Sequence, residues 1–274
     1  LKLGLFDYVS KNNFEKVLIG LSGGIDSALT ATIAVDALGA DNVIGVALPS
    51  KYNTEESLID AKLLSENLDI QFKVIEIEEI VNIFRNTLKE CVNQELEQTT
   101  DENIQSRVRG NILMALSNQT GAMVVSTGNK SEMAVGYSTL YGDLAGGFAL
   151  LKDLYKTEVY NLANFRNSIS SVIPQNTIDK EPSAELRPDQ FDKDSLPEYE
   201  LLDEILRMYI EEDSSSEKII STGIDENIVY DVLSKVDRNE YKRKQVAPGV
   251  KLTEKAFGKD RRMPITNTYI RERG

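Results

Sequence analysis

The chain has 274 residues, of which 41% are hydrophobic and 27% are charged, a composition typical of a globular protein and not of a disordered one. It contains no histidine and one cysteine, which excludes His-based nucleophile pairs, His-based metal sites and any internal disulfide. The net charge of −13 argues against nucleic acid or an anionic membrane as a partner, although residues 238–274 are basic.

The first half of the sequence alternates apolar runs with helical patterns. Residues 1–11, LKLGLFDYVSK, lack a signal-peptide pattern and predict a short amphipathic helix, so we expect a cytoplasmic protein. No apolar run approaches the roughly 20 residues that a membrane helix needs. Buried strands are predicted over 17–21, 43–48, 72–77 and 123–126. Helices are predicted over 26–38, from a cap at Thr54, over 78–90 with an apolar line of Ile80, Phe84 and Leu88, and from Asp101.

This alternation predicts an α/β fold with a doubly wound parallel sheet, of the adenine nucleotide alpha hydrolase-like kind. Beyond about residue 150 the alternation of strands and helices ends. Helices are predicted over 153–165, 198–211 and 226–236, with a proline-containing loop region over 166–197 and a polar linker over 213–216. We expect one domain, 1–274, whose later part is loop-rich and helical. Ligands of such sheets bind at the carboxyl ends of the strands.

The segment Ser22-Gly23-Gly24-Ile25-Asp26-Ser27 follows the first predicted strand and opens a helix. Two glycines permit a tight turn, and the helix N-terminus offers free backbone amides to a phosphate. A carboxylate at Asp26 would be repelled by phosphates unless a cation lay between them, so the motif predicts Mg²⁺. The plainer interpretation is an ordinary helix start with an acidic first turn.

The motif resembles the SGGxDS loop of the ATP pyrophosphatases, which cleave ATP between its α and β phosphates. Further segments occur in the order found in the NAD synthetase family: ENIQSRVRGN, STGNKSE, VGYSTLYGD, EPSAELRP and YKRKQVAP. SAELRP and KAFGKDRRMPITNTY resemble the synthetase portion of the glutamine-dependent branch. In that branch a nitrilase-like glutaminase domain precedes the synthetase, and we find none in this chain. Cys91 is expected to be a core or linker thiol.

The resemblance implies a two-step reaction. The nicotinate carboxylate of deamido-NAD attacks the α-phosphorus of ATP, which gives an adenylate and pyrophosphate, and ammonia then displaces AMP to form NAD. Mg²⁺ is the implied cofactor and ATP the co-substrate. A homodimer is implied as well. Ammonia would come from solution or from a glutaminase domain on a longer native chain.

The resemblance also assigns residues to the nucleotide. Positions that match family contacts to ATP are Ser22, Gly23, Gly24, Asp26, Ser27, Leu48, Thr127, Lys156 and Ser183. Asp26 and Glu132 match metal ligands, and these two with Lys156 are the expected catalytic residues. Each has a plainer interpretation: a helix cap for Glu132, a solvated helix charge for Lys156, and a turn hydroxyl for Thr127.

Positions that match contacts to deamido-NAD are Asn103, Arg107, Asp143, Tyr241 and Lys242. Asn103 and Arg107 stand four residues apart and share a helix face. Leu140 occupies the place of a lysine in the ammonia-dependent branch, so that lysine's role is not transferred. Lys242 and Arg243 are expected to close over the phosphates, with a solvated basic tail or a nucleic-acid arm as alternatives for this region.

Two other functions remain open at this point. One is a tRNA-adenylating pyrophosphatase, which the charge and the lack of a zinc-type cysteine set disfavour. The other is a non-catalytic nucleotide-binding module that kept the loop and lost turnover. The joint presence of Asp26, Glu132 and Lys156 favours an enzyme.

Overall fold

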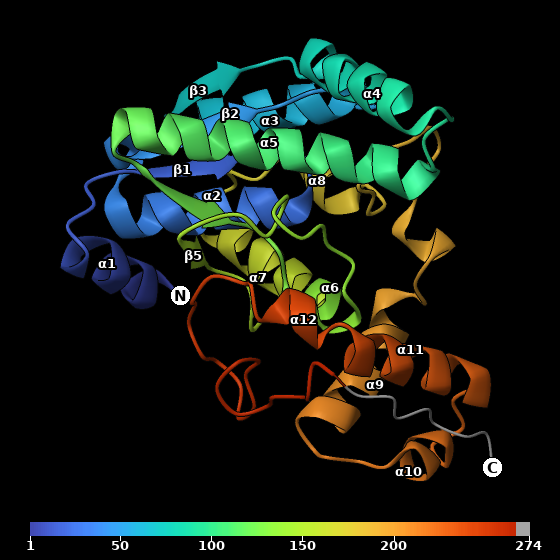
Figure 1. Cartoon of the computed structure of the whole chain (residues 1–274). Helices are drawn as coiled ribbons and strands as arrows, with labels where there is room; N and C mark the ends of the chain where they lie inside the picture. Colours follow the sequence, from blue (N-terminus) through green and yellow to red (C-terminus); the bar gives the residue numbers. More distant parts are fainter. Residues whose placement is uncertain (267–274) are drawn as a thin grey trace.

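The computed structural model describes residues 1–266, and these fold around a five-stranded parallel sheet (Figure 1). The strand order is β3-β2-β1-β4-β5. The strands are β1 Val17–Gly20, β2 Val43–Ala47, β3 Gln71–Val74, β4 Met123–Ser126 and β5 Phe148–Ala149. Because β1 lies centrally between β2 and β4, the chain winds outward in both directions. The doubly wound α/β prediction is therefore confirmed.

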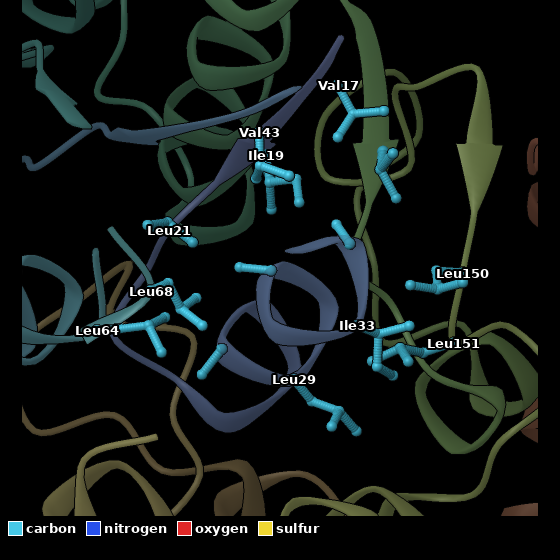
Figure 2. Packing of buried hydrophobic residues seen from close by; sticks show 14 of the residues in the cluster. Val17, Ile19, Leu21, Leu29, Ile33, Val43, Leu64, Leu68, Leu150 and Leu151 are labelled. Carbon is cyan, nitrogen blue, oxygen red and sulfur yellow. The ribbon is translucent and has the colours of Figure 1, made fainter. Parts of the chain in front are cut away.

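Side chains of the strands alternate between two hydrophobic clusters, one on each face of the sheet. Val17 and Ile19 face the cluster under α1 (Lys2–Lys11), α2 (Ile25–Leu38), α3 (Glu55–Asn67) and α7 (Lys156–Ile169). Leu18 faces the cluster under α4 (Glu78–Val92) and α5 (Gln98–Thr120). Figure 2 shows the first cluster, where Leu29 and Ile33 of α2 pack near Leu150 and Leu151. Burial on both faces explains why the strands read as continuous apolar runs.

The helices of the sheet-bearing part follow the predicted order with shifted ends. They are α1 Lys2–Lys11, α2 Ile25–Leu38, α3 Glu55–Asn67, α4 Glu78–Val92, α5 Gln98–Thr120, α6 Lys130–Val135 and α7 Lys156–Ile169. Thr54 caps α3 as predicted. The helix predicted over 153–165 begins three residues later, because Asp153 turns inward to bind the backbone of residues 252 and 253.

The helices of the later part of the chain lie beside the sheet (Figure 1). They form a hydrophobic cluster of their own. The helices of this part are α8 Gln175–Asp179, α9 Tyr199–Ile210, α10 Ser216–Ile220, α11 Glu226–Arg238 and α12 Glu240–Arg243. The short helix α8 lies within the region predicted as loop, and α10 begins at the last residue of the predicted linker 213–216. Faces of α6, α9 and α11 pack on one another, which ties this part to the end of β4. In residues 1–266, no helix has both the length and the apolar character that crossing a membrane requires.

Candidate active site

A cavity opens at the carboxyl ends of β1, β2 and β4, as expected for a parallel sheet. Most of the residues that the sequence proposed for ATP and metal line it: Ser22, Gly24, Asp26, Ser27, Leu48, Thr127, Glu132, Lys156 and Ser183. Asp143 lines it too. The structure thus brings together positions that lie up to 161 residues apart in the sequence.

The turn between β1 and α2 is built by glycine and serine. Gly23 has a positive φ of 81°, and a Cβ atom there would lie 2.3 Å from the carbonyl oxygen of Ser57. The Ser22 hydroxyl accepts a hydrogen bond from the Gly24 amide at 3.2 Å, and the Ser27 hydroxyl donates to the Gly24 carbonyl at 2.9 Å. No side chain caps the N-terminus of α2, so its free amides remain available to an anion at the cavity.

Gly23→Ala is expected to abolish nucleotide binding and to destabilise the fold by about 1–3 kcal/mol. The added methyl both strains the positive φ and collides with backbone, which cannot move aside. Gly24→Ala is the matched comparison, because φ is −88° there and the added Cβ meets only the Ser22 hydroxyl at 3.3 Å. Thermal unfolding and calorimetric titration with ATP check both variants. Equal losses in the two would contradict the argument.

Lys156 joins the two proposed metal ligands. Its ammonium lies 2.5 Å from Asp26 Oδ2 and 3.3 Å from Glu132 Oε1, and its side chain is 4% exposed. Asn129 donates to Asp26 Oδ1 at 2.8 Å. The same Asn129 forms a reciprocal capping box with Glu132 at the start of α6, so the helix-cap interpretation of Glu132 holds alongside its contact with Lys156.

The buried ammonium of Lys156 therefore forms ion pairs with two carboxylates, those of Asp26 and Glu132. Burial raises the pKa of Glu132 to about 8, against the lowering effect of Lys156, and the charge of Asp26 raises it further. Burial opposes the charge of Lys156, yet the two carboxylates together raise its pKa above the ordinary value. Below pH 8 Glu132 is therefore largely protonated and Lys156 balances the charge of Asp26, whereas a bound cation would favour the ionised form of Glu132.

We expect the protein to lose stability relative to its Glu132→Gln variant as the pH rises. The pKa of Glu132 is about 8 in the folded protein, above the 4.5 of an ordinary glutamate, so folding favours its protonated form. The stability that this protonation contributes is complete below pH 4.5 and is lost as the pH rises through 8. Between pH 6 and 9 the difference should change by about 2 kcal/mol, or roughly 5 °C in Tm. Thermal unfolding of both proteins checks it, with Glu204→Gln on the exposed side of α9 as control. Parallel stability curves would contradict it.

The donor set at this position fits Mg²⁺, which prefers carboxylate oxygens and retains several waters. Asp26 and Glu132 approach the same Lys156 atom, so their oxygens lie near each other across the mouth of the phosphate loop. Among residues 1–266, no group of three or more acidic or thiol side chains is arranged around one point as a complete protein-made metal cage. A metal here would be completed by water and by a ligand's phosphates.

The residues proposed for deamido-NAD gather elsewhere, around the loop 136–143. Thr139 donates to Asn103 Oδ1 at 2.7 Å, and Arg107 donates to the Leu140 carbonyl at 3.2 Å. Asp143 accepts from the Thr139 amide at 2.8 Å. Lys242 donates to two carbonyls of this loop, those of residues 136 and 138, each at 2.7 Å. All four side chains thus support one loop beside the cavity.

The expectation that Arg243 closes over phosphates is wrong. Its guanidinium is buried and donates to the carbonyls of Ala134 and Val236, so it binds helix ends instead of an external anion. Tyr241 is 44% exposed and does not line the cavity. Ser183 lines the cavity, but its hydroxyl donates to the Gln190 carbonyl at 2.5 Å. Cys91 is exposed near the end of α4, which corrects a core placement.

Sequence reasoning missed five charged residues that line this cavity: Arg109, Lys180, Glu181, Glu185 and Asp192. Arg109 donates to the Leu48 carbonyl at 2.9 Å and to Asn53 Oδ1 at 3.0 Å, and burial lowers its pKa to about 10. Glu185 accepts from Ser57 at 2.5 Å and from Asn53 at 2.8 Å, which fastens the loop 181–190 across α3. Asp192 lies beyond that loop. Three of them lay in segments quoted for the family resemblance, Arg109 in ENIQSRVRGN and Glu181 and Glu185 in EPSAELRP, and that position was the available signal.

The fold and the site define a class: a parallel α/β protein with a glycine-serine phosphate loop and a lysine held between two acids. The family model described as NAD synthase matches residues 1–246, and the chain belongs to the NAD synthase family. It is 55% identical over 271 residues to the glutamine-dependent NAD(+) synthetase of Aquifex aeolicus, covering 99% of this chain and 48% of that protein. The chain spans about half the length of the curated relatives it matches.

Two solved structures extend the comparison. The glutamine-dependent NAD+ synthetase of Acinetobacter baumannii in complex with ADP is 48% identical, with a TM-score of 0.64, and the match covers 95% of this chain and 47% of that one. The NH3-dependent NAD synthetase of Campylobacter jejuni is 30% identical, with a TM-score of 0.70, and the match covers 87% and 90% of the two chains. The family prediction made from the motifs is confirmed.

Proposed function

We propose that this chain catalyses the ATP-dependent amidation of deamido-NAD to NAD, as a ligase that releases AMP and pyrophosphate. The arrangement of Asp26, Lys156 and Glu132 at the mouth of the phosphate loop carries the proposal. Family membership and the ADP named for the Acinetobacter relative support ATP as co-substrate.

The first step brings a carboxylate to a triphosphate, so its main barrier is repulsion between anions. Free amides at the start of α2 and the Lys156 ammonium would offset charge on the phosphates. Asp26 and Glu132 would hold Mg²⁺, which supplies further charge neutralisation when bound. The nicotinate carboxylate is already ionised and needs no base, which suits a protein without histidine.

We propose ammonia as the nitrogen donor, either free or supplied by a glutaminase domain. The NH3-dependent Campylobacter protein supports free ammonia as the source. The glutamine-dependent relatives support a glutaminase domain, because about half of their length lies outside the match. A homodimer is proposed on family resemblance, and sedimentation equilibrium tests it.

The function is tested by supplying the protein with ATP, Mg²⁺, deamido-NAD and ammonium and measuring NAD, AMP and pyrophosphate. Equal amounts of all three products are expected. Turnover only when tRNA replaces deamido-NAD would favour a tRNA-adenylating enzyme. Tight ATP binding without cleavage under every condition would favour a non-catalytic module.

A further inference from the structure

Asp203 is a buried carboxylate that lies outside the cavity and contacts the helices that carry Lys156 and Glu132. It belongs to α9, is 2% exposed and does not line the cavity. The helices α6 and α7 lie side by side, and both contact α9 (Figure 1). A single side chain of α9 can therefore act on both active-site helices without touching a ligand.

Both oxygens of Asp203 bind the first turns of these helices. Its Oδ1 accepts a hydrogen bond from the Ser131 hydroxyl at 2.5 Å. Its Oδ2 accepts two, from the backbone amide of Thr157 at 2.9 Å and from the Thr157 hydroxyl at 2.8 Å. Ser131 in turn accepts from the backbone amide of Lys156 at 2.9 Å. The carboxylate thus fixes the residue that precedes Glu132 and the residue that follows Lys156.

These hydrogen bonds supply a cap that α7 lacks. The first amides of a helix have no partner within the helix. The N-cap residue Tyr155 makes no side-chain cap hydrogen bond, because its hydroxyl lies at the far end of the ring. Asp203 and Ser131 bind the amides of Thr157 and Lys156 instead, from two other helices. A carboxylate is also the favoured charge at a helix N-terminus. The place of Lys156 relative to α6 is therefore set by α9.

The same helix also contacts the far end of the Lys156 side chain. The Lys156 ammonium lies over the ring of Tyr199, 5.2 Å from its centroid. Tyr199 and Asp203 are four residues apart on α9 and so share one face of that helix. One face of α9 thus acts on Lys156 twice, on its backbone through Asp203 and on its ammonium through Tyr199. The ammonium itself pairs with Asp26 and Glu132.

We propose that Asp203 is a positioning residue, which holds α7 against α6 so that the Lys156 ammonium stays between Asp26 and Glu132. The proposal rests on the function proposed above, because it takes Lys156 as the cation that acts on the phosphates. Asp203 itself touches no substrate. A displacement of about 1 Å in an active site can lower the rate by about 100-fold, so even a small shift of α7 would affect the reaction.

Asp203→Asn tests the proposal in two backgrounds. The substitution preserves shape, but one acceptor oxygen becomes an N–H donor that cannot accept from Ser131 or Thr157. With deamido-NAD present, we expect exchange of labelled pyrophosphate into ATP to slow about tenfold. The KM for deamido-NAD should stay within about twofold of the wild-type value. In the Lys156→Met background the same substitution should slow exchange by less than about threefold, because the group that Asp203 positions is gone.

Asp237→Asn is the matched control. Asp237 is also a buried acid of the helical part, 6% exposed, and it accepts from the Tyr209 hydroxyl at 2.7 Å. Its substitution should lower Tm, as Asp203→Asn does. It should leave exchange within about twofold at a temperature where circular dichroism shows every variant to be folded.

Three results would overturn the proposal. The first is an unchanged exchange rate in Asp203→Asn. The second is an equal effect of Asp203→Asn with and without Lys156, and the third is an equal loss of exchange in Asp237→Asn. Either of the last two would attribute the loss to the fold as a whole and not to the position of Lys156.

Thr157→Val and Thr157→Ser form a second pair in case Asp203→Asn does not fold. Valine keeps the shape and removes the hydroxyl that donates to Asp203 Oδ2, whereas serine retains that hydroxyl. Exchange should fall about threefold in Thr157→Val and stay at the wild-type rate in Thr157→Ser. Equal rates in the two variants contradict the role given to Asp203. Absence of exchange in the wild type is a separate result, which rejects the proposed function itself.

Discussion

Lys156→Met is expected to lower the rate of pyrophosphate exchange by about 10²–10³-fold, with a much smaller change in the affinity for deamido-NAD. Lys156 is the buried cation nearest the phosphate loop, and it contacts both Asp26 and Glu132. Without it, those carboxylates would repel the triphosphate. Steady-state exchange kinetics with each substrate varied in turn measures the effect.

Two comparisons separate charge from structure. Lys156→Arg keeps the positive charge in a wider group and should retain more activity than Lys156→Met. Lys62→Met removes an exposed lysine on α3 that pairs with its helix neighbour Glu66, and it should leave exchange unchanged. A Lys156→Met enzyme with near-normal exchange would show that phosphate binding does not depend on this cation, and the function proposed here would lose its main support.

The sheet and the phosphate loop could be predicted because their signals are local. Strands buried on both faces read as apolar runs, and Ser22 to Ser27 lie next to each other in the sequence and in space. The short β5 gave no such signal, since it pairs with β4 through only two residues. The helix predicted over 78–90 exists, and Leu88 of its predicted apolar line packs on the core, but the other two members of that line were placed wrongly. Ile80 and Phe84 are 38% and 47% exposed, while Val81 and Arg85 are buried.

Arg85 explains that error. Its guanidinium forms ion pairs with Asp101 and Glu78, so this charged side chain can lie at a buried position where an apolar one was expected. Asp192 and Glu185 escaped prediction for a related reason. Both lie in a proline-containing segment without periodicity, and their partners are fixed by tertiary contact: Tyr199 for Asp192, and Ser57 for Glu185. Glu132, 106 residues from Asp26, could be placed near it because both follow predicted strands at the carboxyl edge of the sheet, whereas Lys156, 130 residues away, was placed only by resemblance to relatives.

Lys130 is the second position at which a large effect is expected. It lies in the STGNKSE segment between Asn129 and Glu132, yet its side chain is completely buried and turned away from the cavity toward the later part of the chain. Its ammonium lies 3.0 Å from Asp153 Oδ1 and 2.9 Å from Glu211 Oε1, and it donates to the Thr253 hydroxyl at 2.7 Å. Lys130 therefore connects the active-site helix α6 to the basic C-terminal segment.

Lys130→Met is expected to reduce the free energy of unfolding by about 3–5 kcal/mol and to lower Tm by roughly 10 °C. The methionine fills similar space, but Asp153 and Glu211 lose their buried partner, and an uncompensated carboxylate at 1% exposure is costly. Pyrophosphate exchange should fall as well, because the Asn129–Glu132 capping box begins beside this residue. Chemical denaturation and exchange kinetics measure the two effects.

Lys255→Met is the control for Lys130→Met. Both lysines form ion pairs that hold the C-terminal segment, but Lys130 is buried and Lys255 is not. Lys255 pairs with Asp213, whose side chain is 66% exposed, so its removal should cost less than about 1 kcal/mol. The Lys255 carbonyl, which accepts from Lys130, remains in that variant. If both variants unfold at the same denaturant concentration, the buried pair contributes no more than a surface pair. The C-terminal segment would then be held by its backbone contacts to Asp153 instead.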